Sequence, residues 1–344
     1  MAQVQKSTAG AGLAGRVERL LPPHVGACVL ALVDGEIVFR QGFGRADAET
    51  GTACTPATNF RMASVSKQFT AAAVMRLVED GRLSLDATLD QFFPGFPEYG
   101  RKIEVRHLLT HTSGVPDYEA LVPKGTTLQL NDVDVLQLLL ETKRPKFPAA
   151  EKFEYSNSGF VLLGLIVEQV AGKPFHEFVR DEILLPIGME HSLIYQRGLN
   201  NVPNRAFGHE FQEGQWVRAD QSVTSATRGD GCVYTSVDDY AKWLQTMDAK
   251  KVLKSSTWDA VFQPQVEAWE GTHYGFGWFL DTYRGEPRIY HNGDSQGFRI
   301  TSQRFPMRRA AVFVQLNGSV DDEKWPMTKV GEQIADVLVF GGDQ

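Results

Sequence analysis

FRMASVSKQF, residues 60–69, places Ser64 and Lys67 three residues apart where an Ala-rich helix, residues 66–80, is expected to begin and Gly81 to end it. A serine in the first turn of a helix has a free backbone N–H at the positive end of the helix dipole. Lys67 is expected one turn further along the same face, within reach of the serine hydroxyl. The pair is suited to nucleophilic catalysis, because a neutral lysine can accept the proton of a hydroxyl. A helix-start serine beside a solvated lysine is the alternative.

Outward from this segment, strand patterns occur towards both ends of the chain and helix patterns dominate between them. The expected strands are 26–32, 37–41, 288–290, 298–305 and 310–316. A C-terminal helix with one apolar face follows them, with Pro326 at its first position. The sequence therefore predicts an α+β fold: an antiparallel sheet built from both termini and flanked by helices, with an inserted, mostly helical subdomain.

These patterns predict three parts. Residues 1–24 form an N-terminal extension or helix, residues 25–75 and 225–344 form the sheet domain, and residues 76–224 form the inserted helical domain. Because clefts usually form where two units meet, the functional site is expected at the junction of the sheet and helical domains.

The composition is typical of a globular protein, with 344 residues of which 42% are hydrophobic and 22% charged. Lysine and arginine number 35 against 42 acidic residues, so the net charge is −7 and no basic tract suggests a nucleic-acid partner. No apolar run is long enough to span a membrane. The three cysteines, Cys28, Cys54 and Cys232, fit neither a disulfide framework nor a zinc site.

The first 24 residues include Lys6, Arg16 and Arg19 but no apolar core ahead of a cleavage site, so no secretory signal is predicted. The sequence as given is therefore expected to be cytoplasmic. If an export signal has been removed, the protein would be periplasmic or secreted.

Two further motifs carry groups that could act on a substrate. Tyr155-Ser-Asn157 places a phenol that can carry a proton near an amide that can hold a substrate amide. In His291-Asn-Gly293 the glycine permits the close backbone approach that a substrate-lining strand requires. Each pattern is weak alone, because Tyr290-His-Asn292 and His24-Val-Gly26 match them too.

Other candidate sites fit less well. Gly293-Asp-Ser295-Gln-Gly297 matches the nucleophile elbow of α/β-hydrolases, but a strand is expected after it and no histidine follows His291. His107 and His111 have a metal-like spacing without the glutamate of the metalloprotease motif or a third ligand. We therefore expect no metal ion and no cofactor. Arg299 is expected on a solvated strand face, although it could meet a substrate carboxylate.

Taken in order, Ser64-x-x-Lys67, Tyr155-x-Asn157 and His291-x-Gly293 resemble the three motifs of the penicillin-recognising serine hydrolases. Tyr-x-Asn in place of Ser-Asp-Asn resembles the branch related to class C β-lactamases, with its DD-peptidases, D-aminopeptidases and family VIII esterases. Residues 105–114 and 274–278 look like the same branch, and the resemblance covers roughly residues 26–340.

The resemblance implies a catalytic role for each of the first two motifs. Ser64 would be acylated, with Lys67 as its partner in proton removal. Tyr155 would carry the proton to the leaving group and activate water for deacylation, and the resemblance leaves open whether Lys67 or Tyr155 is the main base. Asn157 would bind the acyl-side amide of the substrate.

The third motif departs from the Lys-Thr-Gly of many relatives. The resemblance implies that His291, Asn292 and Gly293 bind substrate, and that the backbone N–H groups of Ser64 and Asp294 form the oxyanion hole. His291 could be a cation or a neutral donor near neutral pH. Asn292 lacks the hydroxyl that receives a penicillin carboxylate, and Asp294 adds a like charge, so β-lactam binding is expected to be weak.

The sequence therefore predicts a serine hydrolase that acts through an acyl-enzyme on esters or on D-amino-acid peptides and amides, with a small-molecule or peptide acyl substrate. A true β-lactamase or a DD-peptidase of the penicillin-binding protein type is the alternative. A penicillin-binding receptor that is acylated without turnover is a further alternative. The natural substrate and the oligomeric state are not indicated by the sequence.

Overall fold

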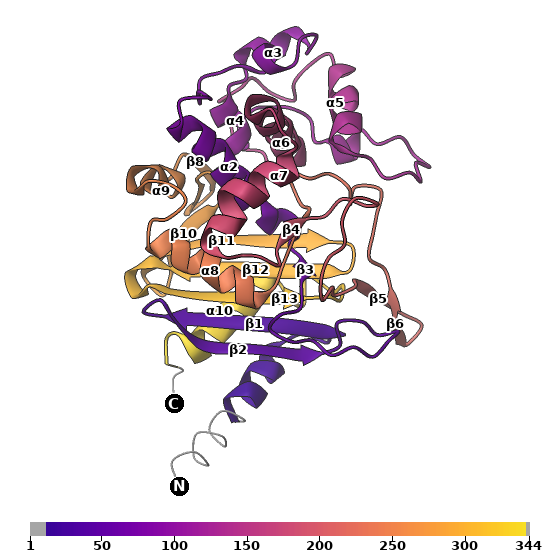
Figure 1. The fold of residues 1–344 in the computed structure, drawn as a ribbon, viewed down its shortest axis with the longest axis vertical. Helices are drawn as coiled ribbons and strands as arrows, with labels where there is room; N and C mark the ends of the chain where they lie inside the picture. The colour runs from indigo at the N-terminus through magenta and orange to yellow at the C-terminus, as the bar shows by residue number, and fades with distance from the viewer. Residues whose placement is uncertain (1–11, 342–344) are drawn as a thin grey trace.

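In the computed structural model, which describes residues 12–341, strands from the two ends of the chain pair in one antiparallel sheet (Figure 1). Its order is β2-β1-β13-β12-β11-β10-β9-β8. The bounds are β1 (Gly26–Val33), β2 (Glu36–Gly44), β8 (Val266–Trp269), β9 (Thr272–Tyr274), β10 (Phe279–Tyr283), β11 (Glu286–Ser295), β12 (Phe298–Phe305) and β13 (Ala310–Leu316). The predicted α+β fold with a sheet built from both termini is thus confirmed.

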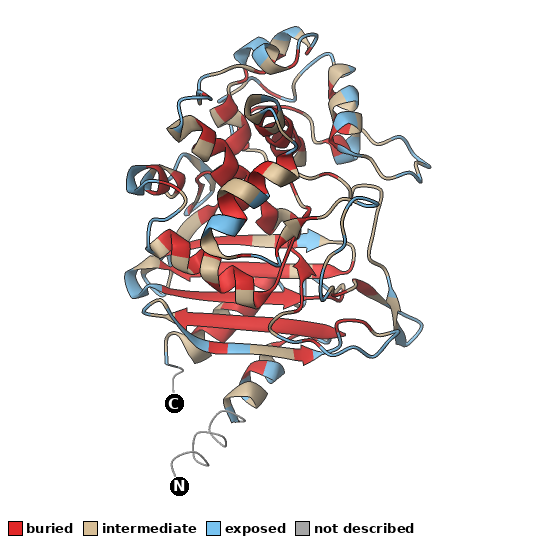
Figure 2. Cartoon of the chain, in the orientation of Figure 1, coloured by how far each residue is buried: buried red, intermediate tan, exposed pale blue. Residues whose placement is uncertain are grey.

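The alternation of side chains along β1 divides the core into two layers. Cys28, Leu30 and Leu32 face one cluster, which includes residues of α2 (Lys67–Glu79) and α8 (Val237–Asp248). The intervening residues of β1 face a second cluster with residues 12–20, which are helical, and with α10 (Met327–Leu338). The sheet is therefore covered on both faces, and Figure 2 shows its central strands buried and its edge strand β2 partly exposed.

The middle of the chain is mostly helical and stacks on the α2 side of the sheet (Figure 1). Its helices are α3 (Leu89–Phe92), α4 (Val105–Leu109), α5 (Asp132–Leu140), α6 (Asn157–Ala171) and α7 (Phe175–Val179), and α9 (Ser255–Val261) comes later in the chain. Two small sheets pair β3 (Phe60–Arg61) with β7 (Val233–Thr235) and β4 (Leu193–Ile194), and β5 (His209–Gln212) with β6 (Gln215–Arg218).

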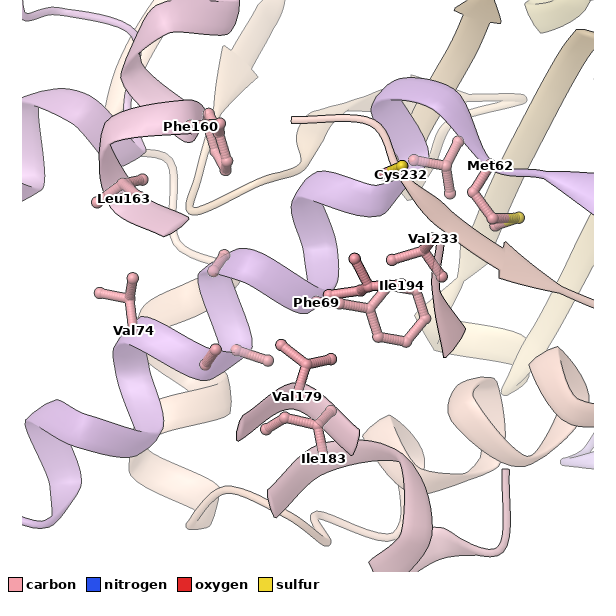
Figure 3. Packing of buried hydrophobic residues seen from close by; sticks show 14 of the residues in the cluster. Met62, Phe69, Val74, Phe160, Leu163, Val179, Ile183, Ile194, Cys232 and Val233 are labelled. Atoms are coloured by element: carbon pink, nitrogen blue, oxygen red, sulfur yellow. The ribbon is translucent and has the colours of Figure 1, made fainter. Parts of the chain in front are cut away.

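Helix α2 is the central element between the sheet and the helical region. Its small alanines allow close packing, and nearly all of its residues are buried. Figure 3 shows Phe69 of α2 near Ile194 and Val233 of the small sheet, with Phe160 on the neighbouring helix α6. This packing fixes the N-terminal end of α2, where Ser64 and Lys67 lie.

Several element boundaries differ from those expected. The strand predicted at 288–290 is the ten-residue β11, and the predicted helix starts with a 3-10 turn, Ala63–Ser66 (η1). Pro326 caps α10 instead of occupying its first turn. The division into residues 1–24, 25–75 with 225–344, and 76–224 stays a prediction, and residues 1–11 of it lie outside the described part of the chain.

Candidate active site

Ser64 and Lys67 meet at the junction of η1 and α2. The Lys67 side chain is fully buried, and its Nζ donates to Ser64 Oγ over 3.0 Å. The same Nζ donates to Asn157 Oδ1 over 2.8 Å and to the carbonyl oxygen of Asp230 over 3.0 Å. Three acceptors match the three donors of an ammonium group, which is the condition for burying one. The structure thus brings Ser64, Lys67 and Asn157 together.

The backbone around Ser64 is held in an uncommon conformation. Ala63 has a φ of 45°, in the left-handed region that non-glycine residues seldom adopt. Strand β11 passes close by, because a Cβ placed on Gly293 would lie 2.4 Å from the carbonyl oxygen of Met62 and 3.3 Å from the backbone nitrogen of Ser64. A side chain at Gly293 would therefore push the strand away from the turn that carries the serine.

From His291 onward, the edge of β11 that faces β10 is not paired with another strand. Pairing with β10 ends at Tyr290, whereas pairing with β12 continues to Ser295. The backbone of His291 to Ser295 therefore lies along η1 with one edge free of β10. This is the edge to which the predicted oxyanion-hole residue Asp294 belongs, directly after the glycine that touches Ser64.

Tyr155 lies beside the Ser64–Lys67 pair, immediately before α6. Lys67 Nζ is 5.0 Å from the centroid of the Tyr155 ring, and the ring of His111 lies 4.1 Å from that of Tyr155. The phenol oxygen is buried and has no hydrogen-bond partner in the described chain. The backbone N–H of Ser156 donates to His111 Nδ1, and burial together with the charge of Lys67 lowers the pKa of His111 well below its usual value.

His291 is buried next to this group, in contact with a tyrosine. Its Nδ1 donates to the carbonyl oxygen of Asn292, and its Nε2 lies 3.2 Å from Tyr274 Oη. Burial, with the charge of Lys67 as a second cause, lowers the pKa of His291 to about 3. The imidazole is therefore neutral near neutral pH, and the expectation that it could be a cation there is corrected.

Asn292 points away from the site. Neighbouring residues of a strand face opposite sides of the sheet, and Asn292 Nδ2 donates to Thr328 Oγ1 of α10 over 2.6 Å. The structure therefore does not bring this side chain to Ser64, and the substrate-binding role expected for it is corrected.

Asp294 and Arg299 form an ion pair across the β11–β12 hairpin, with Arg299 Nη1 2.6 Å from Asp294 Oδ1. Arg299 also pairs with Asp322 and its side chain is only 13% exposed, which corrects the expectation of a solvated strand face. Burial raises the pKa of Asp294 to about 6, although Arg299 opposes the shift. The like charge expected to repel β-lactams is thus partly balanced by a neighbour.

A cavity of about 390 Å³ opens beside Ser64, on the side of Asn157. Polar and charged side chains line most of it, from Arg61, Ser64, Tyr118, Glu119, Asn157, Ser222, Thr224, Ser225, Thr227, Asp230, Asp294, Ser295 and Gln296. Neither Tyr155 nor His291 lines this cavity. No motif in the sequence indicated Glu119 or Asp230. Arg61 lies within residues 60–69, but its spacing to Ser64 does not match a motif that predicts a function.

The rival sites do not assemble. Gly293 to Gly297 forms the hairpin between β11 and β12 and no strand-to-helix turn. His107 Nδ1 and His111 Nδ1 each accept from a backbone N–H. Within residues 12–341 no three His, Cys, Asp or Glu residues are grouped as a metal site requires. No helix of that part combines the length and the apolar character needed to cross a bilayer.

The Beta-lactamase family model matches residues 16–331 of the chain. Penicillin-binding protein 4* of Bacillus subtilis (strain 168) is 29% identical over 311 residues, which cover 86% of this chain and 68% of that protein. The chain spans between 59% and 68% of the length of the first curated relatives that it matches.

Two solved structures have the same fold. The D-amino acid amidase from Ochrobactrum anthropi SV3, complexed with L-phenylalanine amide, matches with a TM-score of 0.83 and 25% identity, over 95% of this chain and 97% of the amidase. The octameric penicillin-binding protein homologue from Pyrococcus abyssi matches with a TM-score of 0.82 and 25% identity, over 99% of this chain and 78% of the homologue.

Proposed function

Since the chain belongs to the Beta-lactamase family and is a serine hydrolase of its penicillin-recognising branch, we propose that it hydrolyses esters or amides, D-amino-acid peptides and amides among them, through an acyl-enzyme on Ser64. The observation that carries the proposal is the 3.0 Å contact between Ser64 Oγ and Nζ of the fully buried Lys67. The likeness to a D-amino acid amidase supports the amide class of substrate.

In the acylation step a base, either Lys67 as a neutral amine or Tyr155 as a phenolate, takes the proton of Ser64 Oγ, and the oxygen attacks the carbonyl carbon of the substrate. The negative charge on the carbonyl oxygen is then met by the backbone N–H groups of Ser64 and Asp294. Preorganised donors of this kind typically contribute about 10²- to 10³-fold each to the rate. The close passage of Gly293 along η1 supports this pairing of donors.

Tyr155 would return the proton to the leaving group and later activate the deacylating water. Its phenol oxygen is buried without a protein partner, which leaves it free to bond with substrate or water. Either Lys67 or Tyr155 can be the main base, and the kinetics of the Tyr155 variant below separate the two. Asn157 Oδ1 accepts from Lys67. Its Nδ2 donates to Glu119 over 3.3 Å, and the second N–H of that amide is available for the carbonyl of an acyl-side amide.

The third motif favours ester or peptide cleavage over β-lactam hydrolysis. His291 is neutral at neutral pH and offers no cation to a β-lactam carboxylate. The side chain of Asn292 is bonded to Thr328 and offers no hydroxyl to it. A substrate carboxylate on this side of the site would therefore lose the charge-assisted hydrogen bonds that such recognition needs.

The test is turnover of p-nitrophenyl acetate, D-alanine p-nitroanilide and nitrocefin by the wild-type chain and by Ser64→Ala. We expect sustained hydrolysis of the ester or the anilide, faster than of nitrocefin, and a loss of at least about 10³-fold in the variant. Ser64→Ala should remain folded, because the hydroxyl makes one hydrogen bond, worth about 1 kcal/mol. Ser295→Ala, which removes the serine of the rival elbow, should keep turnover.

Three results would contradict the proposal. Activity of Ser64→Ala above a few per cent of wild type would exclude Ser64 as the nucleophile. Stoichiometric acylation without turnover would support the receptor alternative. Nitrocefin hydrolysis faster than ester or anilide hydrolysis would support a true β-lactamase.

A further inference from the structure

Arg61 is a buried cation that lacks a partner next to the nucleophile. It lies in β3, lines the cavity beside Ser64, and is only 3% exposed. Its Nε and Nη1 are buried without a hydrogen-bond partner, and it forms no ion pair within residues 12–341. Two comparably buried arginines outside the cavity are paired, Arg304 with Asp248 and Arg288 with Asp281, each at 2.6 Å. The carboxylates of Asp230 and Asp220 act on this charge only from beyond ion-pair distance. A buried charge without a direct partner is costly, so Arg61 has the character of a binding group.

Asp230 is a buried carboxylate with one free oxygen in the same cavity. It is 6% exposed, its Oδ2 accepts from the hydroxyl of Tyr118 over 3.3 Å, and its Oδ1 is buried without a partner. Its backbone oxygen accepts from Lys67, which holds the residue next to the catalytic centre. Gly229 permits this placement, because a Cβ there would lie 2.1 Å from the carbonyl oxygen of Phe160 in α6.

The remaining charged groups of the cavity are already engaged. Glu119 accepts from Asn157 Nδ2 over 3.3 Å, and Asp294 pairs with Arg299. Arg61 and Asp230 do not pair with each other, so within the described chain they are the cavity's two charged groups with unpartnered buried atoms. Because both residues line the same cavity, a ligand that has both an acceptor and a donor would suit them.

We propose that Arg61 and Asp230 form a charged subsite for the acyl part of the substrate, and that this part ends in both a carboxylate and an ammonium group, as an amino acid does. The carboxylate accepts from Arg61, and the ammonium donates to Asp230 Oδ1. The assignment to the acyl part rests on the proposed function, in which Asn157 binds the acyl-side amide and so directs that part of the substrate into this cavity. An apolar acyl chain would leave both charges buried and unpaired.

The test measures inhibition of p-nitrophenyl acetate hydrolysis by a matched series of five-carbon acids, each resembling an acyl product: valerate, glutarate, 5-aminovalerate, and D- or L-glutamate. One carboxylate of each acid occupies the position of the acyl carbonyl, and the other end enters the cavity. We expect glutamate to have an inhibition constant at least about tenfold below that of valerate, since it alone satisfies both charges. Glutarate and 5-aminovalerate should lie between.

Two substitutions assign the two charges separately. Arg61→Gln should raise the inhibition constants of glutarate and glutamate about tenfold relative to that of valerate. Asp230→Asn should do the same for 5-aminovalerate and glutamate. Arg304→Gln removes an equally buried arginine away from the cavity and is the matched control, expected to leave the order of the four acids unchanged. If Arg61→Gln fails to fold, Arg61→Lys and Asp230→Asn still provide the comparison.

The outcomes separate this inference from the proposed function. If the wild-type chain does not hydrolyse the ester, the proposed function fails first. If it hydrolyses the ester but the four acids inhibit equally, or if each substitution changes all four inhibition constants alike, the charged subsite is overturned and the hydrolase stands. Selective loss of the charge-bearing inhibitors supports the subsite.

Discussion

The two sides of Ser64 are built from different kinds of group. On one side is the cavity, lined by hydroxyl and charged side chains. On the other side is an aromatic wall, formed by the rings of His111, Phe153, Tyr155, Tyr274, Phe279 and His291. Lys67 is common to both, since its Nζ bonds to the backbone of Asp230 and lies 5.0 Å from the Tyr155 ring.

The difference has an electrostatic consequence for each side. In the cavity, burial raises the pKa of Asp294 to about 6, but the ion pair with Arg299 opposes this shift, so the carboxyl is mostly charged near neutral pH. In the aromatic wall, few dipoles are available to solvate a charge, so burial lowers the pKa of His291 and of His111 and keeps both neutral. We infer that the cavity is suited to recognising a charged substrate group, and the aromatic wall to holding proton-transfer groups in a dry environment.

Among substitutions in the two sides of the site, the largest effect is expected from removing the phenol oxygen of Tyr155, which is buried in the aromatic wall without a partner in the described chain. Tyr155→Phe should lower kcat by about 10²- to 10³-fold, within the range typical of a lost general acid or base. Its stability should hardly change, because Tyr155 Oη makes no hydrogen bond in the described chain. Steady-state kinetics with p-nitrophenyl acetate and thermal unfolding measure the two quantities.

Tyr240→Phe is the matched control. The Tyr240 hydroxyl bonds to Gln68 and Ser302 in the core, so this variant should lose about 1 kcal/mol of stability for each bond and keep kcat. If Tyr155→Phe kept wild-type kcat with an unchanged pH profile, Tyr155 would have no part in proton transfer and Lys67 would be the main base.

A smaller effect is expected at the strand that separates the two sides. Gly293→Ala adds a Cβ that would lie 2.4 Å from the carbonyl oxygen of Met62, so β11 must move away from η1 and take the Asp294 N–H with it. We expect a loss of about tenfold in kcat/KM, part of what one oxyanion donor contributes. Gly15→Ala, where only the flexible end of Arg19 lies near, is the control and should be silent. Full activity of Gly293→Ala would show that this contact does not position the site.

Local geometry explains why part of the site could be predicted. Ser64 and Lys67 are three residues apart on a helical start, and Tyr155 and Asn157 flank a helix N-terminus, so sequence spacing alone places each pair. The orientation of Asn292 could have been predicted as well, because it alternates with His291 and with Gly293 along a strand.

The rest of the site depends on packing between segments that are distant in sequence. Arg61 lacks a partner because of what surrounds it in the fold, and Asp230 reaches Lys67 only because Gly229 allows close contact with α6. The neutral state of His291 follows from its burial, which no local pattern encodes. Spacing therefore indicated the groups that we propose to react, and tertiary contacts determine their charge and the character of the cavity beside them.

The smallest expected effect tests the dryness of the aromatic wall through the pH dependence of stability. The pKa of His291 is about 3 in the folded chain, below the usual value for an unfolded histidine of about 6.5. Between these values the unfolded state binds a proton that the folded state does not, so stability falls as the pH is lowered through this range. One such group contributes a slope of up to about 1.4 kcal/mol per pH unit. His291→Asn should remove this contribution to the slope, as measured by urea unfolding between about pH 7 and about pH 4.5.

Tyr274→Phe keeps the buried imidazole, so it should retain the slope and lose only the hydrogen bond to His291 Nε2. Parallel stability curves for wild type and His291→Asn would mean that His291 is solvated or charged in the folded protein, and the contrast between a dry wall and a charged cavity would then not hold.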